Sequence, residues 1–389
     1  MKKIFLRLLM PITLNLLLCG CNDNNDFAPQ QPELPQTNKR NYIQMVGDEA
    51  YIISKYDSNY DIIVHFAKTL KNDLFTVRRI YLAENTDTEL LTEHRRPVAV
   101  LLSNQESSDM IGPLSVRTGN DLSWIGANHL YLNQTSGVKS SRTDSYTIYA
   151  DGKEITVGCT YADNITVQVL NTIFDPNVAP SEGDTILSSP LIKESIAFNV
   201  DQGEILVGVE HKYLKDVYVG IYYGMQSMFI TGTQFITADC GFSDWQEEPT
   251  SGEINIKKSI APQLSRFSQK SASGYYQNTI LLRYGLGKHE YLDNESPIFK
   301  WAGQKIYHVL IHNRTIPADT SLSWMGIYNW NKPLTDDDTH YIYAYNVNGI
   351  EYLSVTAKGA ESTSITKTDE YDNESCLQWE KLWKMCPEK

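Results

Sequence analysis

The sequence predicts an all-β protein, a large antiparallel β-sandwich, with two packed β layers or subdomains as the alternative to a single one. After position 41 the chain consists of short runs rich in Val, Ile, Tyr and Thr, separated by clusters of Asn, Asp, Gly and Ser. Such runs are typical of strands and turns, and long amphipathic helical patterns are scarce. Asp151-Gly152 and Asn348-Gly349 lie between runs, where a type I′ hairpin turn needs positive φ at both central positions. The clearest strand runs are residues 62–66, 98–102, 146–149, 165–170, 205–209, 217–223, 279–283, 306–311 and 341–345.

The N-terminal segment has the composition of an export signal. Lys2, Lys3 and Arg7 form a positive region, and the apolar stretch at residues 8–18 is interrupted by a proline and an asparagine. That stretch is too short and too broken to span a bilayer as a permanent helix, so it predicts a cleaved signal peptide at residues 1–20.

Residues 18–21, Leu-Cys-Gly-Cys, resemble a bacterial lipobox. The resemblance implies that the mature chain begins at Cys21 and that this cysteine carries the lipid anchor, with palmitate as one acyl group. The acidic run at residues 22–26 is similar to the signal that brings Bacteroidota lipoproteins to the outer face of the outer membrane. The expected location is therefore the outer membrane, lipid-anchored and facing the cell surface.

The rest of the chain divides by composition. A stretch with three prolines and no apolar periodicity follows the lipobox, and it predicts a flexible tether. The tail holds Cys376 and Cys386, which are close enough in sequence to form a clip, although four cysteines after Cys21 leave three pairings open. The expected organisation is a tether at 21–41, a β-sandwich region at 42–375 with a candidate joint near 175–184, and a C-terminal tail at 376–389.

Charge and motifs exclude several function classes. The chain has 34 basic and 47 acidic residues, a net charge of −13, and no basic block longer than a pair, so we expect no nucleic-acid partner. It contains no glycine-rich phosphate loop, no His-Glu-x-x-His and no Gly-x-Ser-x-Gly. His308 and His312 would lie roughly 13 Å apart on one strand, too far for a shared metal ion. No metal site and no cofactor are expected.

Two histidine–tyrosine pairs are candidates for general acid/base chemistry. On an extended backbone His129 and Tyr131 would share one face, and so would His211 and Tyr213. Each pair would hold a proton donor and an acceptor on a rigid element. A half-buried structural role is the alternative for each pair.

Segments at residues 109–113, 124–129, 142–146, 149–152 and 222–226 resemble secreted and surface β-sandwich proteins that act on polysaccharides. Among carbohydrate-active families of Bacteroidota, they are most similar to uronate polysaccharide lyases. That resemblance implies a site of His, Tyr, Asn and Arg rather than paired carboxylates. The expected catalytic residues are Asn128, His129, Arg142, His211 and Tyr213, and the expected substrate-binding residues are Trp124, Tyr131, Tyr222, Tyr223, Gln226 and Trp330.

The resulting hypothesis is a surface lipoprotein that cleaves a uronic-acid polysaccharide by β-elimination. This reaction needs a group that neutralises the C6 carboxylate, a base for the C5 proton and an acid for the leaving oxygen. The alternative is a glycan-binding lipoprotein or adhesin without catalysis, in which aromatic side chains provide flat faces for sugar rings. The lyase and the glycan-binding lipoprotein have a polysaccharide as partner, and an adhesin would share the chemistry and differ only in its partner. His129 and His211 are expected to converge on one solvent-open cleft.

Overall fold

The structure is a computed structural model of the 389-residue chain. It describes residues 39–103, 110–228, 234–237, 242–247, 253–260, 264, 266–271, 273–282, 286, 290–302, 305–330, 340–347 and 350–357. The predicted signal peptide, Cys21, most of the tether, Asn348-Gly349, Cys240 and the cysteines of the tail lie outside these residues.

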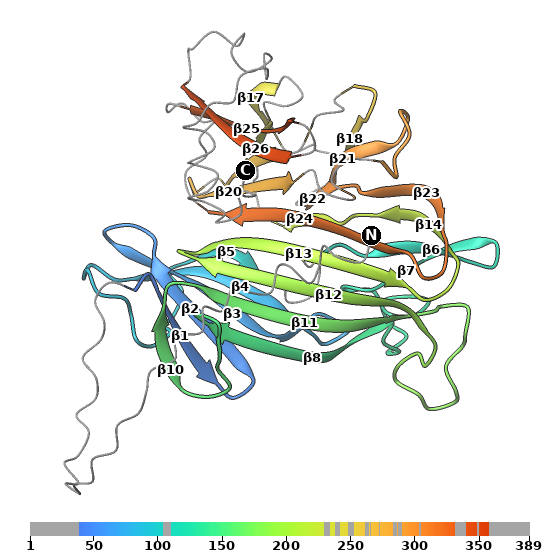
Figure 1. The fold of residues 1–389 in the computed structure, drawn as a ribbon, viewed down its shortest axis with the longest axis horizontal. Coiled ribbons are helices and arrows are strands. Elements are labelled where there is room, and N and C mark those ends of the chain that lie inside the picture. The colour runs from blue at the N-terminus through green and yellow to red at the C-terminus, as the bar shows by residue number, and fades with distance from the viewer. Residues whose placement is uncertain are drawn as a thin grey trace, which may run out of the picture. The chain divides into compact units, whose positions relative to one another are not determined.

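The first five strands and β10 form a six-stranded antiparallel sheet (Figure 1). In sheet order it consists of β10 (Cys159–Ala162), β1 (Asn41–Val46), β2 (Glu49–Lys55), β3 (Tyr60–Thr69), β4 (Leu74–Glu84) and β5 (Ala99–Ser103). Side chains alternate between its two faces, as period-two patterns require. This sheet carries the candidate functional site.

A ten-stranded sheet provides the second large layer. Its order is β17 (Phe242–Glu247), β16 (Gln234–Thr237), β19 (Arg266–Lys270), β20 (Tyr276–Leu282), β24 (Ser321–Asn329), β13 (Glu204–Tyr213), β12 (Pro190–Asp201), β11 (Ile165–Phe174), β8 (Ser141–Ala150) and β9 (Lys153–Glu154). The candidate joint near 175–184 belongs to the connection between β11 and β12, which pair with each other in this one sheet.

Two four-stranded sheets and a hairpin complete the described strands. The β14 sheet has the order β23 (Ile311–Ile316), β14 (Val217–Tyr222), β6 (Leu114–Thr118) and β7 (Asp121–Ile125). The β22 sheet has the order β15 (Met225–Met228), β22 (Lys305–His308), β21 (Pro297–Ala302) and β18 (Glu253–Lys257). The hairpin pairs β25 (His340–Val347) with β26 (Ile350–Ala357).

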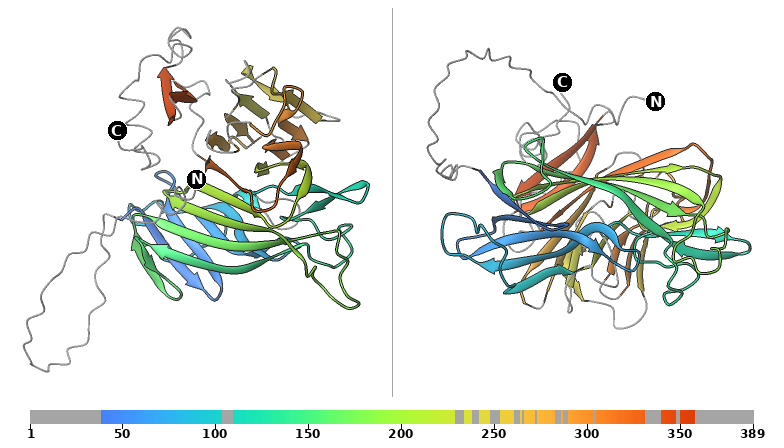
Figure 2. Two further views of the ribbon diagram at one scale, coloured as in Figure 1. Left: turned by 45° about the vertical axis from the view of Figure 1, so that its right-hand side comes forward. Right: turned by 90° about the horizontal axis from the view of Figure 1, so that it is seen from below.

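The core joins the inner faces of the six-stranded and ten-stranded sheets, which Figure 2 shows from two further directions. Val64 of β3 and Val207 of β13 are fully buried in one apolar cluster. Phe66 and Phe198 meet edge to face, with ring centroids 5.3 Å apart. Because burying such a side chain stabilises a fold by roughly 1.5–3 kcal/mol, this shared cluster holds the two layers together.

The predicted fold class is confirmed, because the described residues form antiparallel sheets and contain no α-helix. The hairpin turn at Asp151-Gly152 is also confirmed: φ is 49° and 79° at these positions, and the turn joins β8 to β9. No described segment is a helix of the length and apolarity needed to cross a membrane.

Candidate functional site

The predicted site residues on β13 and β14 lie in the core. His211 is 1% exposed, and Tyr213 and Tyr222 are fully buried in the main apolar cluster. The His211 ring packs 4.9 Å from that of Tyr222, and its Nε2 lies 2.7 Å from Oε2 of the buried Glu194. The expected solvent-open placement of these residues is therefore wrong, because this face of β13 points toward the apolar interior.

Three other predicted residues do come together. The His129 ring stacks on Trp124 with centroids 5.4 Å apart, and Trp124 stacks on Tyr223 at 5.2 Å. Tyr223 packs against the small apolar cluster of the β22 sheet, whereas its neighbour Tyr222 belongs to the main core. Since successive side chains of an extended chain point to opposite sides, His129 and His211 lie on opposite sides of the β14 sheet. The expected convergence of the two histidines on one cleft is wrong.

The remaining predicted residues are not part of this stack, and one of them, Asn128, forms a hydrogen bond with the backbone of another segment. The Arg142 side chain is exposed, and its Nε donates a hydrogen bond to Asp144 at 2.8 Å. Asn128 is 6% exposed, and its Oδ1 accepts a hydrogen bond from the backbone NH of Lys71 at 2.8 Å. Gln226 and Trp330 are only 3% and 1% exposed, so the expectation that they form a sugar-binding surface is wrong. Tyr131 is half-buried.

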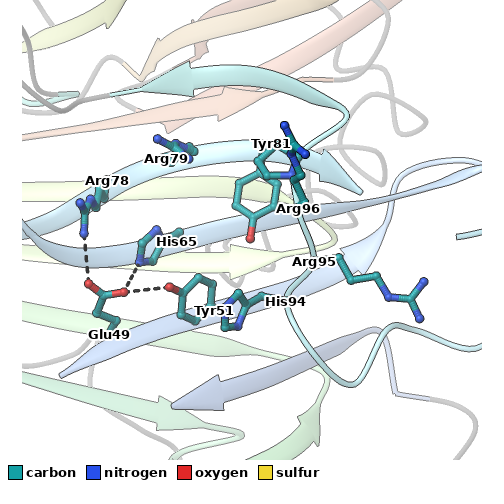
Figure 3. Close-up of a pocket in the computed structure, with 10 residues that line it drawn as sticks. Glu49, Tyr51, His65, Arg78, Arg79, Tyr81, His94, Arg95 and Arg96 are labelled. Atoms are coloured by element: carbon teal, nitrogen blue, oxygen red, sulfur yellow. Dashed lines mark hydrogen bonds and ion pairs between the residues drawn. The ribbon is translucent and has the colours of Figure 1, made fainter. Parts of the chain in front are cut away.

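A different group of polar residues forms a pocket on the outer face of the six-stranded sheet (Figure 3). The cavity has a volume of about 440 Å³, within the range of small-molecule sites. Four arginines, two histidines and two tyrosines surround a single carboxylate. The lining residues are Glu49, Tyr51, His65, Arg78, Arg79, Tyr81, His94, Arg95, Arg96 and Pro97.

Strand register explains why the floor of the pocket is polar. Tyr51 of β2 faces His65 of β3, and His65 faces Arg79 of β4. Directly opposed residues point to the same face of a sheet, so these three side chains form a line across the strands. Their chain neighbours Ile52, Val64 and Ile80 lie in the core instead.

A β-bulge adds the second arginine of β4. His65 pairs with Arg79 and Phe66 pairs with Val77, which leaves Arg78 as an extra residue in β4. Val77 and Ile80 on either side of the arginine pair are both fully buried. The bulge therefore places two consecutive arginines on the outer face, in keeping with the way bulges redirect side chains.

Glu49 is the centre of the hydrogen-bond network in the pocket. Its Oε2 accepts a hydrogen bond from the Tyr51 hydroxyl at 2.8 Å and lies 3.0 Å from His65 Nε2, and its Oε1 accepts one from Arg78 at 3.1 Å. The Tyr51 ring is stacked between His65 and His94, with centroid distances of 4.2 and 3.9 Å. These contacts fix the orientation of the pocket floor before any ligand binds.

The connection between β4 and β5, residues 85–98, forms the wall. At its start the buried Asp61 accepts hydrogen bonds from Asn85 Nδ2 at 2.7 Å and from the backbone NH of Leu91 at 2.9 Å. Leu91 packs into an apolar cluster on the outer face. Further on, the backbone NH of His94 donates to Gln44 Oε1 at 3.3 Å. Because both parts of the loop are attached to the sheet, His94, Arg95 and Arg96 are held beside the floor.

Electrostatics set the protonation states. Burial opposes ionisation of Glu49, but the hydrogen bond from Tyr51 and the nearby His65 and Arg78 outweigh it, so the pKa of Glu49 is lowered. Burial lowers the pKa of His65 to about 4, against the opposing influence of Glu49. Burial also raises the pKa of Tyr81 to about 12. At neutral pH the pocket therefore holds an ionised Glu49, a neutral His65 and a neutral Tyr81.

The neutral state of His65 fixes its tautomer. A carboxylate only accepts hydrogen bonds, so Nε2 carries the proton and donates to Glu49, and Nδ1 keeps its lone pair. No hydrogen bond to Nδ1 is formed by the described part of the chain. The site thus contains an oriented imidazole that is available as a proton acceptor.

Three of the arginines lack an ion pair among the residues that the structure describes. Arg78 binds Glu49, but Arg79, Arg95 and Arg96 form no ion pair with any described residue. The Nε of Arg79 is buried without a hydrogen-bond partner in the same part of the chain. Unneutralised guanidinium groups gathered at one pocket are suited to binding carboxylate, sulfate or phosphate groups.

Metal chemistry finds no support among the described residues. They contain no group of three or more His, Cys, Asp and Glu side chains that could hold a metal ion. His308 lies in β22 and His312 in β23, which belong to two different sheets.

Histidine burial leads to a prediction for stability. Burial lowers the pKa values of His65 and His129 to about 4, and the positive charges of Lys305 and Lys71 add to the effect on His129. Between about pH 4 and 6.5 the unfolded chain therefore binds more protons than the folded chain, so these histidines make stability rise with pH across that window. We expect His65→Gln and His129→Gln each to flatten the pH dependence of urea unfolding there. An unchanged dependence in the double variant would contradict this assignment.

Comparisons with known proteins identify no family. No family model matches the sequence, and no curated protein matches it. The fold is similar to the galactosidase domain of the α-galactosidase–sucrose kinase AgaSK, with 10% identity, a TM-score of 0.37, and coverage of 77% of this chain and 41% of that chain. It is similar to a heparan sulfate lyase HepC mutant from Pedobacter heparinus, with 10% identity, a TM-score of 0.32, and coverage of 85% and 43%. It is also similar to a galactose 1-epimerase from Lactobacillus acidophilus NCFM, with 8% identity, a TM-score of 0.29, and coverage of 76% and 99%.

This chain thus spans less than half the length of the first two of these proteins. Proteins that act on carbohydrates are among its structural neighbours, but similarity at these scores assigns it no activity.

Proposed function

We propose that this protein binds a polysaccharide bearing carboxylate or sulfate groups in the pocket formed by Glu49, His65 and the four arginines. The observation that carries the proposal is the presence at one cavity of three arginines, Arg79, Arg95 and Arg96, that form no ion pair with any residue the structure describes. Like charges held together without counter-charges destabilise a fold, and their retention at a cavity is typical of functional sites.

The net charge of the chain does not oppose this ligand at short range. The whole sequence carries −13, and loss of residues 1–20 would remove three basic and no acidic residues, giving −16. Distant charges are screened over about 8 Å at physiological ionic strength. A polyanion close to the pocket therefore interacts mainly with the local arginines, and their geometry allows bidentate binding of planar acid groups.

The same residues supply the groups that β-elimination of a uronic acid requires. An arginine such as Arg79 would neutralise the C6 carboxylate. Nδ1 of His65 would accept the C5 proton, the C4–O bond would break, and the neutral Tyr81 hydroxyl would donate its proton to the leaving oxygen. Figure 3 shows the Tyr81 side chain on the same face of the sheet as His65. Polysaccharide lyase activity is thus the specific reaction that we propose for the pocket.

Incubation of the detergent-solubilised full chain with polygalacturonate, alginate and heparan sulfate tests both levels of the proposal. Calorimetry measures binding, and the ultraviolet absorbance of the new C4=C5 double bond measures elimination. We expect binding of at least one of these polymers and none of neutral dextran. Binding without an absorbance change would leave a glycan-binding protein or adhesin, and equal binding of dextran would refute the arginine-based site.

For the lyase reaction, we expect His65→Asn to lower turnover by about 10²-fold or more, because a proton transfer is lost. Binding should be largely retained, since the arginines remain. His129→Asn is the matched control, because His129 lies in the connection between β7 and β8 and does not line the pocket, so this variant should leave turnover unchanged. Full turnover in His65→Asn would remove His65 as the base.

We also propose that the protein is lipid-anchored through Cys21 and faces outward from the outer membrane. The positive region, the apolar stretch and the lipobox-like residues 18–21 support this location. We expect Cys21→Ala to abolish labelling by a palmitate analogue and retention in the membrane fraction. Cys159→Ala is a control that should keep both, and membrane retention of Cys21→Ala would refute the anchor.

A further inference from the structure

We infer that the pocket is the deepest part of a longer site, which binds an internal segment of a linear polysaccharide running across the strands of the six-stranded sheet. This inference rests on the proposed glycan-binding function and specifies its ligand as a polymer segment rather than a terminal sugar.

The first argument is strand register. Beyond the pocket floor, Gln44 of β1 faces Tyr51, and Cys159 of β10 faces Gln44. In the other direction Arg79 faces Ser103 of β5. One unbroken line of polar side chains therefore crosses all six strands. Its five gaps of about 4.8 Å give roughly 24 Å, the length of several sugar residues.

The second argument is depth. Tyr51 and His65 in the middle of the line are 8% and 7% exposed, whereas Gln44 is half-buried and Cys159 is exposed. Side-chain exposure along the line thus increases from its centre toward the β10 edge. No described strand lies beyond β10 in this sheet, so the strand order leaves that end without a further neighbour.

The third argument is the change of chemistry along the line. On the strands themselves, β4 contributes Arg78 and Arg79, whereas β1 and β10 contribute the neutral polar Gln44 and Cys159. Gln44 Oε1 is occupied by His94, but its side-chain NH₂ has no hydrogen-bond partner in the described part of the chain. An acidic sugar would therefore bind at β3 and β4, and hydroxyls of the following sugars would accept hydrogen bonds near Gln44.

Cys159 provides a reporter at the end of the line. We would prepare a disaccharide and a decasaccharide from each of polygalacturonate, alginate and heparan sulfate, and measure their affinities for the full chain before and after reaction with a bulky maleimide. The His65→Asn background prevents cleavage. The decasaccharide should bind at least tenfold more tightly than the disaccharide. The bulky adduct should lower the affinity for the decasaccharide about tenfold and leave the affinity for the disaccharide unchanged.

Two controls isolate Cys159 from the other cysteines. Cys159→Ser, treated with the same reagent, should keep its affinity for both oligomers. Ser181→Cys in that background carries the adduct in the exposed β11–β12 connection, which does not line the pocket, and should also keep its affinity for both oligomers.

The outcomes separate this inference from the proposed function. Equal affinities for the two oligomers would contradict the extended site, and so would a decasaccharide affinity that the Cys159 adduct does not change. Either result would leave the proposal for the pocket intact. Binding of neither oligomer, labelled or not, would instead overturn the proposed function itself.

Discussion

Replacing His211 by leucine should lower the free energy of unfolding by about 3–5 kcal/mol, the usual cost of removing one partner from a buried ion-paired or hydrogen-bonded pair. Glu194 is 6% exposed, and its two oxygens are held by His211 Nε2 at 2.7 Å and Asn171 Nδ2 at 2.8 Å. Without the imidazole, one carboxyl oxygen would face the apolar core with no partner. Urea unfolding of the variant at neutral pH measures the loss.

Two variants show whether the pair causes the effect. Lys212→Ala changes the next residue of β13, which is exposed on the opposite face, and should cost little. Glu194→Leu combined with His211→Leu removes both polar groups and should recover part of the stability, because apolar replacements of buried pairs are often neutral or stabilising. A loss below about 1 kcal/mol in His211→Leu would mean that the Glu194 carboxyl finds another partner, such as water.

Replacing Arg79 by alanine should weaken binding of the anionic polysaccharide by about 10- to 100-fold, the range expected for losing a charged hydrogen bond worth roughly 1.5–3 kcal/mol. Arg79 lies between His65 and Ser103 in the cross-strand line and forms no ion pair within the described part of the chain. Its removal therefore breaks no described ion pair of the fold. Calorimetry at low and physiological salt measures both the affinity and its salt dependence.

Arg142→Ala is the matched control for Arg79. Arg142 is an arginine of β8 in the ten-stranded sheet, exposed and bonded to Asp144, so its removal should not change binding. Equal losses in the two variants would mean that overall charge drives binding rather than the pocket. An unchanged affinity in Arg79→Ala would remove this arginine from the site.

The fold was predictable because its signals are local. The apolar runs and the Asp151-Gly152 turn depend on neighbours in sequence, and the structure has a positive-φ turn and strands where they predict them, except that the run at 306–311 is divided between β22 and β23. Alternation also predicts correctly that His211 and Tyr213 share a face. It does not say which face is inside, since that depends on the layer packed against it.

The pocket was not predictable in the same way. Tyr51 and His65 lie within apolar strands, and they meet Arg79 only through pairing between strands. Consecutive basic residues at 78–79 and 95–96 were the one available signal. On its own, such a pair predicts only a solvated surface, because the strand register and the attached loop are what turn it into a cavity wall.

Because of the bulge in β4, ligand recognition by the pocket depends on the number of residues in this strand as well as on their identity. Deleting Arg78 would restore simple alternation from Val77 through Arg79 to Ile80, and the same apolar side chains would still face the core. The outer face would then present one arginine instead of two, and Glu49 would lose its guanidinium partner. A single-codon insertion or deletion at this point could therefore change the ligand of the pocket while leaving the sandwich intact, a route by which related chains could diverge in specificity without rebuilding their cores.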